Sequence, residues 1–204
     1  MKPTLYILGD SISLLYGPFL DNMLADKFEI SRKKAGEHQY KLRSGKDIGH
    51  NGGNSRMVLD FLQIQKGKGM FWDYFCLNCG LHDIVRDGKD FPNAISPREY
   101  GENLENIVAL SKDLCKQMVW IRTTPIEKEQ CPGNYSWLAE DVDIFNDIAD
   151  EVMKKADIPV IDLNSFVRSL PKPTTTEGVH YKEEILPKQA AFVAENLTAI
   201  LDNK

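Results

Sequence analysis

Thr4-Leu5-Tyr6-Ile7-Leu8-Gly9-Asp10-Ser11 joins a short apolar run to a tight polar turn, and a helical pattern of apolar residues follows from Ile12 to Phe28. The β-rich apolar run predicts a buried strand, and the spacing after the turn predicts a helix. A strand, a tight turn and a helix in this order form the repeating unit of α/β proteins with parallel sheets. The stretch therefore indicates an α/β fold.

The rest of the chain repeats this alternation. We expect further strands at 71–79, 118–122 and 159–163, a short one within 29–50, and helices over 55–64, 96–116, 138–155 and 183–201. Ser55 is the expected cap of the first of these helices. The near-continuous apolar strands predict a largely parallel sheet covered by helices on both faces. We therefore expect residues 1–204 to form a single α/β domain.

Composition excludes several classes of protein. The 204 residues are 42% hydrophobic and 27% charged, which is typical of a globular protein and not of a disordered or fibrous one. A net charge of −5 gives no general attraction to nucleic acid, so no nucleic-acid partner is expected. The longest apolar runs are much shorter than the roughly 18 residues of a membrane helix. The first residues lack a signal-peptide pattern, so we expect a cytoplasmic protein, or a secreted or periplasmic one if a leader has been removed.

The four cysteines are few for a disulfide framework. Cys76, Cys79 and Cys115 lie in or beside apolar runs, which favours buried thiols. Cys76 and Cys79 form a C-x-x-C pair, but residues three apart on a strand point to opposite faces. We therefore expect no redox or metal role for this pair, and no disulfides.

Polar turns follow the predicted strands, at the sheet edge where parallel sheets bind ligands. Ser11 stands directly after the first strand and opens a helix, which is a favourable position for a nucleophile but also typical of a helix cap. A serine hydroxyl needs a neighbouring base, most often histidine. Of the four histidines, His180 lies three residues after Glu177, which is able to orient its ring. An isolated Glu-x-x-His is also common in surface turns.

Four stretches together resemble the SGNH (GDSL-like) hydrolase superfamily. They are Gly9-Asp10-Ser11-Ile12, Asn51-Gly52-Gly53-Asn54-Ser55-Arg56, Cys79-Gly80-Leu81-His82-Asp83 and Glu177-Gly178-Val179-His180. They occur in the family's order and cover nearly the whole chain. The resemblance implies a three-layer α/β/α sandwich with a five-stranded parallel sheet of flavodoxin-like type, and no cofactor or metal.

The resemblance also implies roles for individual residues. Ser11 corresponds to the nucleophile, His180 to the base, and Glu177 to the group that orients the base. The oxyanion hole would use the N–H of Gly53, which we favour over Gly52, and the His82 side chain. This chain departs from the family pattern twice, with His82 in place of asparagine and Glu177 in place of aspartate. Both replacements keep a suitable chemical group, although the alternative of a Ser–His dyad stays open.

Four further residues at the same edge of the sheet are expected to contact substrate. They are Asp10, Asn54, Thr123 and Tyr181. Tyr135 and Trp137 lie near enough to stack on a sugar, whereas Trp72 and Trp120 belong to the core. We therefore favour a short-acyl esterase acting on a small-molecule or carbohydrate ester, such as a carbohydrate O-acetylesterase.

Other functions remain open on the sequence alone. The same fold and chemistry serve lysophospholipases and thioesterases. A non-catalytic carbohydrate-binding domain would keep the fold without the reaction. A metal-binding domain would use Asp10, His50, His82 and His180 as ligands.

The segment between positions 29 and 50 contains six basic residues: Arg32, Lys33, Lys34, Lys41, Arg43 and Lys46. This segment would overhang Ser11, either as a solvated loop or beside an acidic substrate. The oligomeric state is open.

Overall fold

A five-stranded parallel sheet forms the centre of the protein. The computed structural model describes residues 1–35, 49–88, 90–127 and 135–202. The sheet order is β2-β1-β3-β4-β5, with every neighbouring pair parallel. The strands are β1 (Thr4–Leu8), β2 (Glu29–Arg32), β3 (Trp72–Leu77), β4 (Cys115–Ile121) and β5 (Val160–Ile161). This confirms the expected flavodoxin-like sheet.

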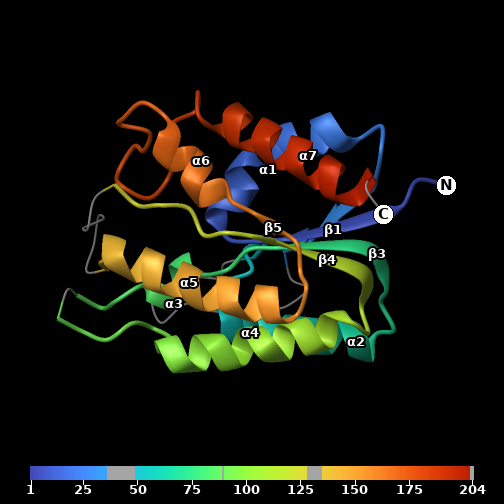
Figure 1. Ribbon diagram of the computed structural model, residues 1–204, viewed down its shortest axis with the longest axis horizontal. Helices are drawn as coiled ribbons and strands as arrows, with labels where there is room; N and C mark the ends of the chain where they lie inside the picture. Colours follow the sequence, from blue (N-terminus) through green and yellow to red (C-terminus); the bar gives the residue numbers. More distant parts are fainter. Residues whose placement is uncertain (36–48, 89, 128–134, 203–204) are drawn as a thin grey trace.

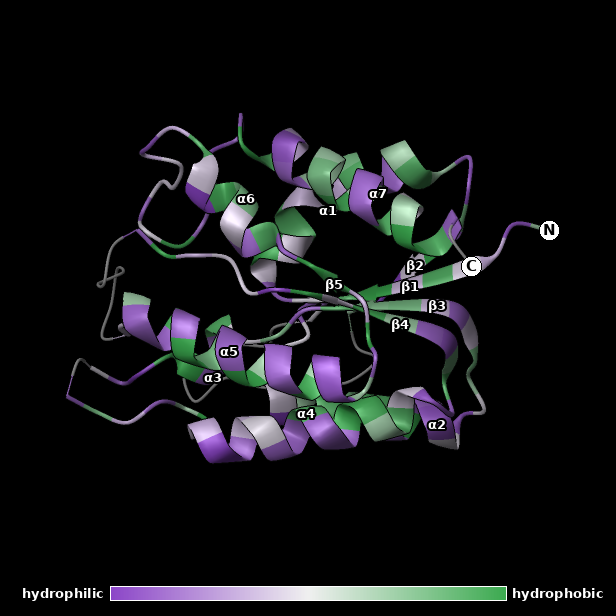
Figure 2. Ribbon diagram, viewed as in Figure 1, coloured by the Kyte–Doolittle hydropathy of each residue, from purple (hydrophilic) through white to green (hydrophobic). Residues whose placement is uncertain are grey.

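Helices cover both faces of the sheet and complete the predicted α/β/α sandwich (Figure 1). One face carries α1 (Ser11–Leu24), α6 (Leu163–Ser169) and α7 (Leu186–Asp202). The other carries α2 (Ser55–Gly67), α3 (Leu81–Ile84), α4 (Pro97–Ser111) and α5 (Ala139–Lys155). Figure 2 shows hydrophobic sides of α4 and α5 turned toward the sheet and hydrophilic sides turned outward. This amphipathic pattern is the one that the sequence spacing predicted.

The starts of three helices follow from their capping residues. The Asp10 side chain accepts a hydrogen bond from the Ile12 N–H and begins α1. The Asn54 side chain does the same for the Met57 N–H and begins α2, so the prediction that Ser55 caps this helix was wrong by one residue. Ser96 caps α4, with Pro97 in the first helical position.

The core contains the expected tryptophans and thiols. Trp72 and Trp120 are buried, as are the free thiols of Cys76, Cys79 and Cys115. Burial raises the pKa of Cys76 to about 12, which keeps this thiol protonated at neutral pH and unsuited to redox exchange. Cys131 lies outside the described residues.

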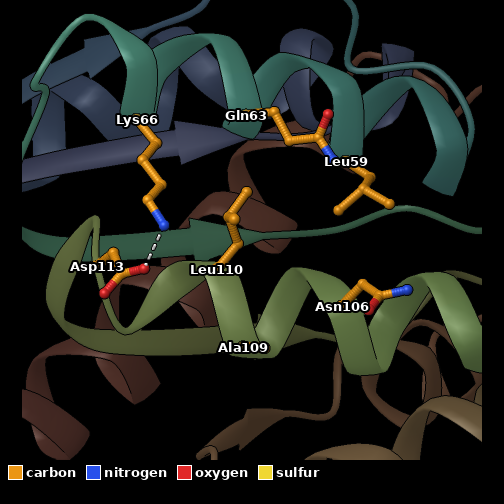
Figure 3. Close-up of a pocket in the computed structure, with 7 residues that line it drawn as sticks. All are labelled: Leu59, Gln63, Lys66, Asn106, Ala109, Leu110 and Asp113. Atoms are coloured by element: carbon orange, nitrogen blue, oxygen red, sulfur yellow. Dashed lines mark hydrogen bonds and ion pairs between the residues drawn. The ribbon is translucent and has the colours of Figure 1, made fainter.

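A groove of about 430 Å³ runs between α2 and α4 on the outer surface (Figure 3). It is lined by Leu59, Gln63, Lys66, Asn106, Ala109, Leu110 and Asp113, and none of these is a predicted site residue. The Lys66 ammonium and the Asp113 carboxylate form an ion pair across it, 2.7 Å apart.

None of the helices in the described part of the chain is long and apolar enough to cross a membrane.

Candidate active site

The order of the strands determines where a site is expected. From β1 the chain moves to β2 on one side, and all later strands add on the other side, so the carboxyl ends of β1 and β3 flank the point where the order reverses. Ligands of such sheets bind at this point. Ser11 follows β1 directly, and His82 lies in α3 just after β3. Two of the predicted site residues therefore come from the two strands that flank the reversal point.

Ser11 and His180 lie within hydrogen-bond distance. The Ser11 Oγ is 2.9 Å from His180 Nε2, although 169 residues separate them in the sequence. Ser11 is the first residue of the 14-residue helix α1, so its hydroxyl and backbone N–H lie at the positive end of the helix dipole. This arrangement suits a hydroxyl that must lose its proton to a neighbouring base.

Glu177 holds the other side of the His180 ring. Its carboxylate hydrogen-bonds to His180 Nδ1 and also accepts from the His180 backbone N–H at 3.0 Å. Partial burial alone would raise the pKa of Glu177, but hydrogen bonds from Thr176 and His180 lower it below its usual range. An ionised Glu177 keeps the proton on His180 Nδ1 and leaves the Nε2 lone pair facing Ser11.

A second glutamate fixes the loop that carries His180. The Glu127 carboxylate accepts hydrogen bonds from the backbone N–H and the hydroxyl of both Thr174 and Thr175, at 2.7 to 3.1 Å. The Glu127 N–H donates to the Gly178 carbonyl at 2.8 Å. Burial would raise the pKa of Glu127, but these hydrogen bonds lower it well below its usual range. No motif in the sequence pointed to this residue.

The glycines of the second motif are engaged within the protein. The Gly52 N–H donates to the Gly9 carbonyl at 2.8 Å, which ties this motif to the turn before Ser11. The Gly53 N–H donates to the Asn51 side-chain oxygen at 2.8 Å. The N–H that we predicted as an oxyanion donor is therefore occupied in this structure. The sequence did not single out Asn51, although it opens the second motif.

His82 lies beside Asn51 and is half-buried. Its Nε2 is 3.2 Å from Asn51 Nδ2. Burial lowers the pKa of His82, and the nearby Asp10 carboxylate opposes this effect only in part. The ring is therefore neutral at neutral pH, so no charged imidazolium occupies this position.

A family model describes the chain as a whole. The model for GDSL-like lipases and acylhydrolases matches residues 5–193. The chain belongs to this family. A search of curated protein sequences found no match.

Solved structures show the same GDSL hydrolase fold. A carbohydrate acetylesterase from Sinorhizobium meliloti has 12% sequence identity and a TM-score of 0.70, over 98% of this chain and 100% of that one. A lipase/acylhydrolase from Enterococcus faecalis has 16% identity and a TM-score of 0.70, over 98% and 97%. An acetyl xylan esterase from Geobacillus stearothermophilus has 14% identity and a TM-score of 0.66, over 97% and 93%. At these identities the likeness establishes the fold.

In this GDSL hydrolase the four predicted substrate contacts have structural roles. Asp10 and Asn54 cap α1 and α2, and Asp10 is only 1% exposed. The Thr123 hydroxyl donates to the Cys79 carbonyl at 3.1 Å, and the Tyr181 hydroxyl donates to the Pro125 carbonyl at 2.6 Å. Thr123 and Tyr181 are buried. The sequence placed these residues at the edge of the sheet, and each of their side chains makes a hydrogen bond to the backbone.

The glycine of the third motif explains why Thr123 lies so deep. Gly80 has a φ of +156°, and a Cβ at this position would lie 2.2 Å from Thr123 Oγ1. Only glycine lets the ends of β3 and β4 approach in this way. Nearby, Trp137 is half-buried and donates its indole N–H to the Leu81 carbonyl at 2.8 Å. Its ring thus lies beside the motif that carries His82.

The ligand set of the metal alternative is not assembled. Within residues 1–35, 49–88, 90–127 and 135–202, no three His, Cys, Asp or Glu side chains gather as a metal site requires. His50 instead places its Nδ1 3.2 Å from the Lys33 carbonyl. Arg32 pairs with Asp21, and the buried Lys33 ammonium donates to the Asn51 carbonyl at 2.7 Å, so neither overhangs Ser11. Lys41, Arg43 and Lys46 lie outside the described residues.

Proposed function

We propose that this GDSL acylhydrolase is a serine esterase with Ser11 as nucleophile, His180 as general base and Glu177 as the group that orients His180. The observation that carries the proposal is the continuous hydrogen-bonded line from Ser11 Oγ through both nitrogens of the His180 ring to the Glu177 carboxylate. This is the arrangement of nucleophile, base and orienting acid used in serine hydrolases on several folds.

The proposed reaction has two steps. Ser11 Oγ attacks the ester carbonyl carbon while His180 Nε2 takes the hydroxyl proton, and the tetrahedral intermediate collapses as His180 protonates the departing alcohol. Water then attacks the acyl-serine, again losing a proton to His180, and the acid leaves as Ser11 regains its proton. The Ser11 N–H, at the α1 N-terminus, and the His82 ring are the proposed donors to the oxyanion.

For the substrate we propose a short acyl group, with acetylated carbohydrate as the favoured class. Support comes from two structural neighbours whose names describe them as acetylesterases of carbohydrates. Trp137, half-buried beside the third motif, and the partly exposed Tyr135 two residues before it add aromatic surface of the kind on which sugar rings stack.

The nucleophile is tested with an activated ester and a serine-directed label. We expect the wild type to hydrolyse p-nitrophenyl acetate and to react with a fluorophosphonate probe, and we expect Ser11→Ala to do neither. Ser13→Ala, two residues further along the same helix, is the matched control and should retain labelling. Hydrolysis and labelling that persist in Ser11→Ala would refute the assignment.

Acyl preference is tested separately. We expect kcat/KM for p-nitrophenyl acetate to exceed that for the palmitate ester by at least tenfold, and we expect acetate release from acetylated xylo-oligosaccharides. Equal or better cleavage of the palmitate ester would overturn the short-acyl proposal and favour a lysophospholipase or thioesterase.

A further inference from the structure

The orientation of the Asn51 side chain is determined by its neighbours. The Gly53 backbone N–H donates to Oδ1 at 2.8 Å. The amide nitrogen of Asn51 could not take this place, because it does not accept hydrogen bonds. The oxygen of the amide must therefore point to Gly53, and the nitrogen must point to His82. The Asn51 carbonyl is also held, because it accepts a hydrogen bond from the buried Lys33 ammonium at 2.7 Å.

This orientation decides which nitrogen of His82 carries the proton. Asn51 Nδ2 lies 3.2 Å from His82 Nε2, and an amide nitrogen only donates. His82 Nε2 must accept, so the ring proton resides on Nδ1. If the ring were doubly protonated, the His82 Nε2–H and the Asn51 amide group would both be donors at this contact, and neither could accept. The amide thus stabilises one tautomer of the neutral imidazole.

The other titratable groups that face His82 are Asp10, at the start of α1, and His180. The Asp10 carboxylate favours a charged His82, whereas His180 and, above all, burial oppose it. Among the described residues, the His82 ring makes no side-chain hydrogen bond besides the one to Asn51. Its Nδ1–H is therefore left for a ligand.

We propose that Asn51 is a positioning residue of the oxyanion hole, which holds His82 in the neutral Nδ1-protonated form so that this N–H donates to the oxyanion. The inference rests on the proposed esterase function for its catalytic part only. The amide that donates directly to the oxyanion in the family's third motif is replaced here by an imidazole, and an amide from the second motif fixes the proton of that imidazole.

The tautomer is measured without reference to activity. Long-range ¹H–¹⁵N correlation spectra of the ¹⁵N-histidine protein distinguish Nδ1–H, Nε2–H and doubly protonated rings, and the signals missing in His82→Asn assign the residue. We expect Nδ1–H in the wild type at pH 7.5. In Asn51→Asp the new carboxylate accepts from Nε2–H, so we expect the neutral Nε2–H form, in which Nδ1 carries no proton. Asn106→Asp, the same charge change in the remote groove, should leave the His82 signals unchanged.

The catalytic part is measured by a double-mutant comparison. Asn51→Asp should lower kcat for p-nitrophenyl acetate about 10- to 100-fold with little change in KM, because one oxyanion donor is worth about 10²–10³ in rate and is here misplaced rather than removed. In a His82→Asn background, the same substitution should change kcat less than threefold. Thermal unfolding confirms that each variant folds.

Two results would overturn the inference. One is a wild-type His82 protonated on Nε2, and the other is an equal loss of kcat from Asn51→Asp in both backgrounds. If the wild type shows Nδ1–H but hydrolyses no ester, the positioning part stands and the proposed function fails, so the two failures are distinguishable.

Discussion

Glu177 contacts its histidine twice, through the ring and through the backbone N–H of the same residue. The second contact fixes the carboxylate relative to the main chain that carries His180. A side chain one methylene longer than the family's aspartate has more freedom to rotate, and the backbone hydrogen bond removes that freedom. The structure therefore favours a triad over the alternative of a Ser–His dyad.

Glu177→Gln tests this distinction. One oxygen of Glu177 accepts from both the backbone N–H and Nδ1 of His180, so the amide oxygen stays at this place and the substitution removes the negative charge that stabilises the imidazolium. We expect kcat for p-nitrophenyl acetate to fall by about 10²- to 10⁴-fold, by analogy with other serine hydrolases. Glu177→Asp keeps the charge and should stay within about tenfold of the wild type. A Glu177→Gln enzyme within threefold of the wild type would indicate a dyad.

The sequence revealed some residues of the site and not others for a physical reason. Ser11 and His180 belong to motifs with a fixed local spacing, so their order along the chain was enough to pair them. Asn51 and Lys33 act through a contact between segments, and local spacing carries no information about that contact. Thr123 was placed correctly at a strand end, but the direction of its side chain depends on the close approach of Gly80.

At the scale of elements, the segment that carries Glu177 and His180 has little regular structure of its own. It follows α6 and precedes α7, and Glu127 gathers the two threonines at its start. The same glutamate pairs with Lys172. This carboxylate thus adds to the segment's own backbone hydrogen bonds, which run from the Thr176 N–H to the His180 carbonyl and from the Lys182 N–H to the Thr174 carbonyl.

Glu127→Gln should loosen this segment. The amide has one acceptor oxygen and cannot satisfy four donors, so we expect the free energy of unfolding at pH 7 to fall by about 1 to 3 kcal/mol. We also expect kcat to fall more than KM rises, because His180 is positioned less well. Glu105→Gln, which removes an exposed ion pair with Lys155, is the matched control and should change neither value appreciably. Unchanged kcat in a destabilised Glu127→Gln protein would confine this residue to stability.

The elements that the sequence predicted are the long ones. The strands and the four long helices after α1 have clear patterns of apolar residues in the sequence. Their expected ranges overlap the observed ones. The helices α3 and α6 were not predicted, since four and seven residues span too few turns to show a helical period. The last strand is shorter than expected, with only Val160 and Ile161 paired to β4.

At the scale of the whole molecule, the interior contains a carboxyl group, Asp83, whose two oxygens are not both hydrogen-bonded within the described residues. Asp83 is fully buried, and its Oδ1 accepts from the Ser55 N–H at 2.9 Å, joining α3 to the start of α2. Its Oδ2 has no hydrogen-bond partner among the described residues. Burial raises the pKa of Asp83 to about 7. The folded protein therefore binds a proton here more tightly than the unfolded chain does.

Asp83→Asn should change how stability depends on pH. Because the folded pKa of Asp83 lies above the unfolded value near 3.8, its contribution is fully present below that value and is lost as the pH rises toward 7. The wild type should therefore lose about 2 to 3 kcal/mol relative to Asp83→Asn between pH 5 and pH 8. Urea unfolding of both proteins at these pH values measures the difference. Asp26→Asn, at an exposed carboxylate beyond α1, should track the wild type, and a pH-independent difference between the wild type and Asp83→Asn would show that this acid is ionised throughout.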